Sequence, residues 1–185
     1  YPGAEGQGVI SVYPLSNLAD KPSTISSDHW LIGASRDSLL LSPYSPTTGN
    51  DRSTRFRPFT VTQMGTDGTV RRTITGVNRV YPGGWLQRFS DPAAAAALAT
   101  GTAGKDDDQT RAAWDALPTQ IVDLNSGSTH DLMGGRTESV GVPTGPGLLI
   151  SHEGADGNGS PQQFWLSADD DGHPHTENLE QFANK

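Results

Sequence analysis

Short apolar runs separated by tight turns recur along this chain and limit it to a fold built from β-hairpins. The clearest example is Thr119–His130 (TQIVDLNSGSTH), where an apolar run, an Asp/Asn/Gly turn and a returning run follow one another. Weaker copies occupy Phe59–Ile74 and Phe164–Leu179. Phe59–Gln63 alternates apolar and polar residues, which is the period of a half-buried strand, and Asp-Gly pairs adopt the positive φ angles of hairpin turns. The pattern predicts an all-β chain.

Composition agrees with a turn-rich β protein that still has a core. The chain has 185 residues, of which 33% are hydrophobic, with 22 glycines and 13 prolines. That balance is typical of many short strands and turns, while four Trp and five Phe supply large core side chains. We expect a single β-repeat domain over residues 9–180, between a flexible N-terminus at residues 1–8 and a frayed C-terminus at residues 181–185.

An alanine-rich segment interrupts the β pattern, and we expect a short helical insertion at about residues 91–117. Asp91 and Pro92 have the residue types preferred at an N-cap and a first helical position, and five alanines follow them. A second helical piece is expected over Asp106–Ala116, where three aspartates lie at the favourable N-terminal end.

Turn glycines at Gly68, Gly127 and Gly172 are separated by 59 and 45 residues, and the longer interval contains the insertion. Within these units, Thr69–Ile74 and Val77–Tyr81 read as separate strands. Without the insertion the repeat is close to the roughly 40–50 residues of a four-stranded propeller blade.

The chain resembles the β-propeller repeats of WD40, TolB-like and quinoprotein proteins over residues 9–180, and Val122–Leu132 is similar to the closing hairpin of such blades. The resemblance implies architecture and no functional residues. It gives about 3.5 blades, whereas closed propellers have typically 4–8. We therefore expect an incomplete or partner-completed propeller, in which another chain or a second copy pairs with the open strand edges. The alternatives are a fragment of a longer propeller, or a β-sandwich or barrel.

Charge excludes some function classes. The net charge is −8, with seven arginines among residues 51–90 and fifteen acidic residues among residues 91–185. A net acidic chain repels nucleic acid, so DNA and RNA are not expected partners. The absence of cysteine excludes disulfides and thiol chemistry, and no apolar run reaches the roughly 18–20 residues of a membrane span.

Low lysine content and Ser/Thr/Gly/Asn-rich loops suggest an extracellular or cell-envelope protein. The first residue is Tyr1, so we expect that a signal peptide or a preceding domain has been removed.

Histidines beside acidic residues are the candidate chemical groups. His130 with Asp131, together with Glu153, could supply acid–base catalysis, although no nucleophile elbow or metalloprotease motif accompanies them. For a divalent metal, His173 and His175 form an H-x-H pair close to Asp171.

No cofactor is predicted from these residues alone. A divalent metal at the H-x-H pair and calcium at residues 156–160, whose polar turn lacks the full set of oxygen ligands, are the two candidates.

Aromatic residues outside the strands are the candidate ligand contacts. Tyr44 and Trp114 lie on a predicted loop and helix, where an exposed ring can stack on a sugar or hold a peptide. With the long loops at residues 43–58, 90–118 and 152–163, they would form a recognition surface on a rigid β scaffold. The sequence thus favours a non-catalytic module that binds a protein or carbohydrate partner; the alternative is an extracellular hydrolase or lyase of glycosidase type.

Overall fold

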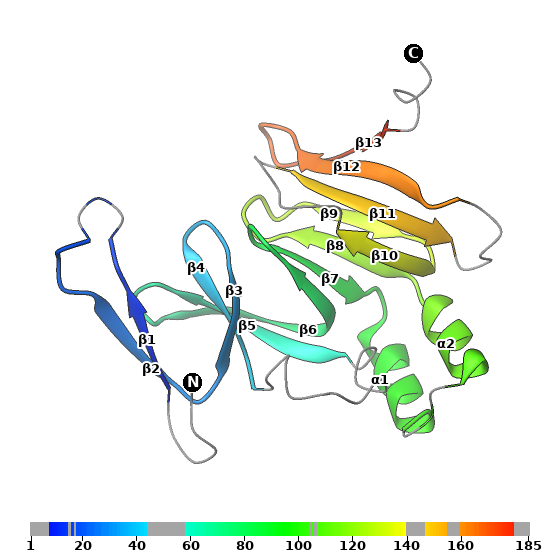
Figure 1. Cartoon of the computed structure of the whole chain (residues 1–185), viewed down its shortest axis with the longest axis horizontal. Coiled ribbons are helices and arrows are strands. Elements are labelled where there is room, and N and C mark those ends of the chain that lie inside the picture. Colours follow the sequence, from blue (N-terminus) through cyan, green and yellow to red (C-terminus); the bar gives the residue numbers. More distant parts are fainter. Residues whose placement is uncertain are drawn as a thin grey trace.

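The computed structural model describes residues 8–14, 16, 18–43, 58–103, 105, 107–139, 147–154 and 160–179. Its strands form antiparallel sheets of two, seven and four strands, and none of the sheets is closed into a barrel (Figure 1). The prediction of an all-β chain is confirmed.

The N-terminal hairpin is the smallest sheet, and it pairs β1 (Gly8–Val12) with β2 (Ser23–Ser27). It packs on the seven-stranded sheet through Ile25, Leu39 and Leu41. Figure 1 shows it at the end of the molecule away from the four-stranded sheet. Apart from Gly8, the expected flexible N-terminus lies outside the described residues, and so does the expected frayed C-terminus.

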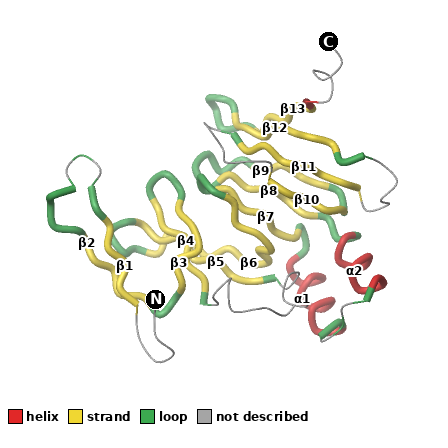
Figure 2. The backbone as a smooth tube through the Cα atoms, in the orientation of Figure 1, coloured by secondary structure: helices red, strands yellow, loops and turns green. Residues whose placement is uncertain are grey.

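In the two larger sheets, each strand pairs with its neighbours in the sequence. The strands of the seven-stranded sheet are β3 (Trp30–Ala34), β4 (Ser38–Ser42), β5 (Phe59–Gly65), β6 (Val70–Tyr81), β7 (Trp85–Phe89), β8 (Thr119–Asp123) and β9 (Thr129–Leu132). Those of the four-stranded sheet are β10 (Gly135–Ser139), β11 (Leu148–Gly154), β12 (Gln162–Ala168) and β13 (Pro174–Asn178). Both are antiparallel meanders in which many neighbouring strands are joined by hairpin turns, as the turn-punctuated sequence predicts, whereas β7 and β8 are joined through the two helices (Figure 2).

The expected division into about 3.5 four-stranded blades differs from these sheets. Only β10–β13 has four strands, and strands assigned to separate repeats form one sheet of seven. The 152–163 loop is also shorter than expected, because its first residues extend β11 and its last extend β12. Residues 155–159, which hold most of the calcium candidate, lie outside the described residues.

The two strands expected on either side of Gly76 are one strand, β6. Gly76 has a φ of +72°, and its position coincides with a shift in the pairing of β5 with β6. A Cβ there would lie 2.8 Å from Cβ of Pro92. Glycine therefore lets the strand bend past the start of the first helix without ending.

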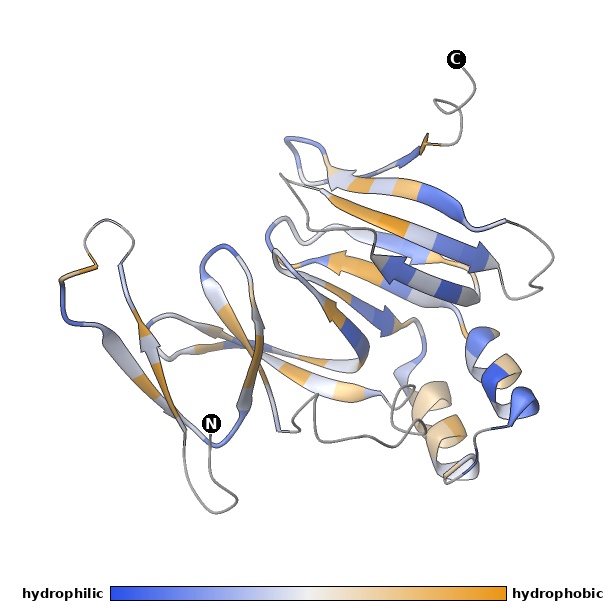
Figure 3. Cartoon of the chain, in the orientation of Figure 1, coloured by the Kyte–Doolittle hydropathy of each residue, from blue (hydrophilic) through white to orange (hydrophobic). Residues whose placement is uncertain are grey.

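Two helices occupy the predicted insertion, α1 (Pro92–Gly101) and α2 (Asp108–Asp115). Asp91 caps α1 as expected, since its carboxylate accepts hydrogen bonds from the backbone amides of Ala93 and Ala94. Asp107 caps α2 in the same way through Thr110. In Figure 3, α1 is evenly apolar and α2 mostly hydrophilic.

The seven-stranded sheet buries apolar side chains on both faces, because successive residues of a strand point to opposite sides. In β7, Leu86 joins a cluster with Leu40 and Val61 within this sheet. The residue before it, Trp85, joins a different cluster with Leu148 and Leu166 of the four-stranded sheet. The second cluster forms an apolar layer between the two large sheets.

Side-chain hydrogen bonds also join these sheets near both edges of the four-stranded sheet. On β10, the carbonyl oxygen of Thr137 accepts a hydrogen bond of 2.6 Å from Arg79 Nη1 of β6. On β13, Thr176 Oγ1 lies 3.0 Å from His130 Nδ1 of β9. The relative position of the sheets is thus set by an apolar layer and polar contacts at its margins.

Candidate binding cleft

A cleft of about 420 Å³ opens where the four-stranded sheet, the seven-stranded sheet and α2 meet. Most of its lining side chains are polar or charged, and they come from β6, β7, α2, β8 and β10 or the residues beside them. The lining residues are Asn78, Arg79, Gln87, Phe89, Trp114, Asp115, Thr119, Gly135, Arg136, Thr137 and Glu138. The volume falls within the range of roughly 300–1,000 Å³ typical of small-molecule sites.

A buried chain of hydrogen bonds fixes the polar side of the cleft. Tyr81 Oη donates to Gln87 Oε1 over 2.9 Å, and Gln87 Nε2 donates to Thr119 Oγ1 over 2.9 Å. Each of these three side chains is less than 5% exposed. Because its partners hold it, Gln87 is a rigid polar group in a face that otherwise carries Trp85 and Phe89.

Charged side chains of both signs line the opening. Arg79 donates one hydrogen bond to the carbonyl oxygen of Thr137. This contact uses one of the five N–H donors of the guanidinium. Arg136 and Glu138 are exposed on β10. Among the described residues, neither of them makes an ion pair within 4.0 Å. The rim thus offers donors and acceptors for a polar ligand.

Asp115 is the most perturbed acid of the cleft. Burial raises the pKa of its carboxyl above the usual value, the positive charge of Arg136 opposes this rise, and the negative charge of Glu153 adds to it. Glu153 of β11 lies opposite Arg136 of β10 in the strand register. Next to it, His152 Nδ1 lies 2.9 Å from Thr137 Oγ1, and burial lowers the pKa of this imidazole.

Trp114 lies at this cleft, although its ring is not the exposed platform that the sequence led us to expect. It is 5% exposed, and its ring centroid lies 5.4 Å from that of Phe89 in the apolar cluster that anchors the helices. It therefore borders the cleft as part of a packed wall. Tyr44, the other expected ligand contact, lies outside the described residues.

The structure places the three catalytic candidates in different environments. His130 is buried between the sheets. Asp131 is exposed and accepts a hydrogen bond of 2.7 Å from Gln120. Glu153 lies on β11 close enough to influence Asp115. No described contact joins the three side chains, so the candidate set does not form one site here.

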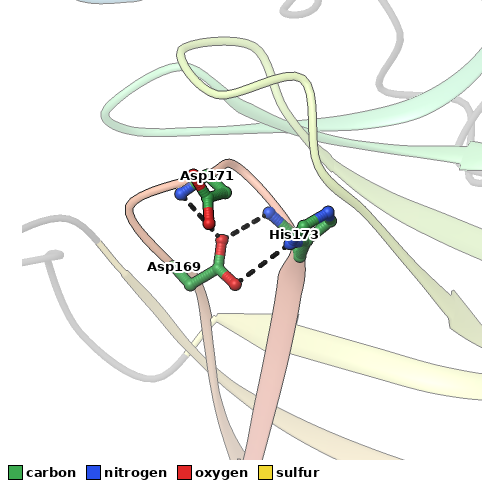
Figure 4. Close-up of side chains that lie close together, drawn as sticks. All are labelled: Asp169, Asp171 and His173. Carbon is green, nitrogen blue, oxygen red and sulfur yellow. Dashed lines mark hydrogen bonds and ion pairs between the residues drawn. The ribbon is translucent and has the colours of Figure 1, made fainter.

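The metal candidates are partly brought together at the β12–β13 turn. Asp171 and His173 are grouped with Asp169, and one ligand atom from each lies within 4.8 Å of the others (Figure 4). His175 is outside this group, so the H-x-H pair is not its basis.

Turn geometry accounts for the contacts in this group. Asp169 accepts hydrogen bonds from the backbone amides of Asp171 and His173, at 3.0 and 2.7 Å, and its other oxygen lies 3.2 Å from His173 Nδ1. All three side chains are exposed, and an Asp that bonds the following backbone is an ordinary turn device.

Comparison of the chain with models of protein families, with curated proteins and with solved structures found no match. Within the described parts of the chain, neither helix has the length and apolarity needed to cross a membrane. The case for a function therefore rests on the cleft.

Proposed function

We propose that this chain is a non-catalytic binding module and that the cleft holds a carbohydrate. The observation that carries the proposal is a concave site whose rim and floor combine planar donors and acceptors. Arg79 and Arg136 donate, Glu138 accepts, and Gln87 and Asn78 do both.

Sugar hydroxyl groups both donate and accept hydrogen bonds, so a mixed set of this kind can satisfy neighbouring hydroxyls. Asn78 Oδ1 is a buried acceptor with no hydrogen-bond partner among the described residues, and rotation of this side chain towards the cleft would let a sugar hydroxyl satisfy it. The packed Trp114–Phe89 pair gives the cleft a rigid apolar wall that would border a bound sugar.

The setting we propose is outside the cell or in the cell envelope, with a partner chain or a second copy completing the sheets as in an unclosed propeller. The lysine-poor composition supports the location. The open sheets support the partner, since β3 pairs only with β4 in the described part of the chain. Light scattering with size-exclusion chromatography tests it: a monodisperse monomer across a wide concentration range would contradict completion by a second copy.

A glycan array followed by calorimetric titration of the sugars it identifies tests the binding function. Arg136→Gln removes an exposed cleft guanidinium, and Arg36→Gln removes an equal charge from the turn between β3 and β4, away from the cleft. Loss of a hydrogen bond to a charged group costs about 1.5–3 kcal/mol, so we expect Kd to rise roughly 10- to 150-fold for Arg136→Gln only. An equal loss in both variants, or no sugar bound at all, would refute the proposal.

The environment of Asp115 favours one alternative, an extracellular hydrolase or lyase of glycosidase type. An acid with a raised pKa beside a second carboxylate is a pattern found at catalytic sites. Asp115 would be the proton donor and Glu153 the second carboxylate. Release of reducing ends from a polysaccharide panel, lost in both Asp115→Asn and Glu153→Gln, would replace the binding proposal with this one.

A further inference from the structure

His130 lies in the layer between the two large sheets, and the binding proposal gives it no role. Its side chain is 5% exposed. Its ring centroid is 5.9 Å from that of Trp85 on β7, and its Nδ1 is 3.0 Å from Thr176 Oγ1 on β13. Its Nε2 is buried and hydrogen-bonds to no described residue. A single histidine thus connects β9 to β13 and keeps one nitrogen unsatisfied.

The protonated ring would suit this place poorly. A neutral imidazole carries one N–H donor, whereas the imidazolium carries two and a positive charge. In the present geometry Nε2 has no hydrogen-bonded acceptor, and although the Ser167 carbonyl and the Asp123 carboxylate favour the charged ring, burying the added positive charge in this layer is costly. Neutral His130 is therefore the form that the packed sheets accommodate.

The charged groups around the ring modify this preference without reversing it. Burial lowers the pKa of His130; the backbone carbonyl of Ser167 on β12 and the carboxylate of Asp123 on β8 oppose the change, and His175 on β13 reinforces it. From β7, the ring faces the uncharged indole of Trp85. Desolvation is the dominant effect.

We propose that His130 is a pH-sensitive pin: neutral, it holds the four-stranded sheet on the seven-stranded sheet, and protonated, it releases that sheet. Release of the sheet also opens the cleft, because β10 forms one wall of the cleft. The strand that carries His130, β9, ends at Leu132, only shortly before β10 begins at Gly135. The extension to the cleft rests on the proposed binding function, whereas the pin itself does not.

The direction of the pH effect follows from linkage. A histidine whose pKa is lower in the folded state contributes full stability above its ordinary value of about 6.5. That contribution is lost as the pH falls from about 6.5 through the folded-state pKa, and below it there is no further change. Each pKa unit of difference shifts the opening equilibrium about tenfold.

An NMR titration of the histidine rings in the whole chain tests the pin directly. We expect His130 to titrate below pH 6.5, and amides of β9 and β13 to lose exchange protection over the same range after correction for intrinsic exchange. Amides of β4 and β5, far from the pin, should keep theirs. Titration of His130 at or above pH 6.5, or unchanged protection across its titration, would overturn the proposal.

Variants separate His130 from the other histidines. His130→Gln removes the titrating ring, so the pH dependence of protection should disappear. It should persist in His173→Gln, an exposed control, and in His152→Gln, whose pKa burial also lowers. If the pH dependence of protection persisted in His130→Gln, or disappeared in His152→Gln, a group other than His130 would be responsible for it.

Should His130→Gln fail to fold, Thr176→Val tests the same contact from the other side. It keeps the histidine and removes its hydrogen-bond partner. Protection of β13 should then be weaker even at neutral pH, and unchanged protection would overturn the pin.

The link to the cleft has its own readout, the protection of the β10 amides. If these stay protected while β13 opens, His130 controls β13 alone, and the proposed release of the whole sheet, with its effect on the cleft, is wrong. If the pin is confirmed but no sugar binds at any pH, only the binding function fails.

Discussion

Removing the Leu166 side chain tests the apolar layer between the two large sheets. Leu166 lies on β12, is 0% exposed, and packs in one cluster with Trp85 and Ile121 of the seven-stranded sheet. Leu166→Ala removes three carbons, worth about 2.4 kcal/mol at about 0.8 kcal/mol each. Hydrogen bonds near both edges of the four-stranded sheet hinder closure of the resulting cavity, so we expect a total loss of about 3–4 kcal/mol.

Urea unfolding followed by circular dichroism measures this loss as a change in the free energy of unfolding. Leu31→Ala is the matched control, because Leu31 is 51% exposed and should cost less than about 1 kcal/mol. A difference between the two variants of less than about 1 kcal/mol would refute the packing of β12 on the seven-stranded sheet. Adding Leu39→Ala, from the separate cluster under the N-terminal hairpin, should give additive losses within about 0.5 kcal/mol.

Three further predictions concern local features. Asp91→Ala removes the α1 cap and should cost about 0.5–2 kcal/mol in urea unfolding, whereas Asp170→Ala, in the exposed turn between β12 and β13, should change stability by less than about 0.5 kcal/mol. Gly76→Ala forces a side chain into a positive φ and against Pro92, so it should cost more than about 1 kcal/mol by the same measurement; a neutral effect would contradict the bend. Burial raises the pKa of Tyr81 to about 12, so its stabilising contribution is complete below about pH 10 and lost as the pH rises towards 12. A phenolate absorbance titration should show a late component that Tyr81→Phe abolishes, and its persistence in that variant would contradict the assignment.

Local signals in the sequence were sufficient to predict the hairpins and the helical insertion. Asp67-Gly68 and the turn after Asp123 specify reversals by their own backbone preferences, and Asp91 with Pro92 specifies a helix start. Strand continuity through Gly76 was missed, because a glycine in a strand pattern reads equally as a break or a bulge. What decides between them is Pro92, which is distant in sequence and close in space.

The cleft was largely missed because its side chains come from five separate segments, and only Trp114 was proposed as a ligand contact. One signal was available. In Trp85–Phe89 (WLQRF), the alternation of a strand places Gln87 on the same face as Trp85 and Phe89. A polar side chain among buried aromatic residues is therefore predictable from the sequence. The placement of β10 and α2 around Gln87 depends on how the sheets pack, and no spacing within the sequence encodes that.

The strictly sequential pairing of strands within each sheet has a consequence for how the molecule forms. Every strand pairs with its neighbour in the sequence, so most of the hydrogen-bonded ladder can form over short connections, and the connections from β4 to β5 and from β7 to β8 are the longer ones. Topologies dominated by such short separations fold fast. Contacts between the large sheets join segments further apart in the sequence, in the apolar layer and where β13 approaches β9 and β10 approaches β6. We therefore expect the strands within each sheet to pair first, and the packing of the sheets on one another to be the slower step of folding. A chain assembled in this order can gain or lose a terminal hairpin without disturbing any pair already made.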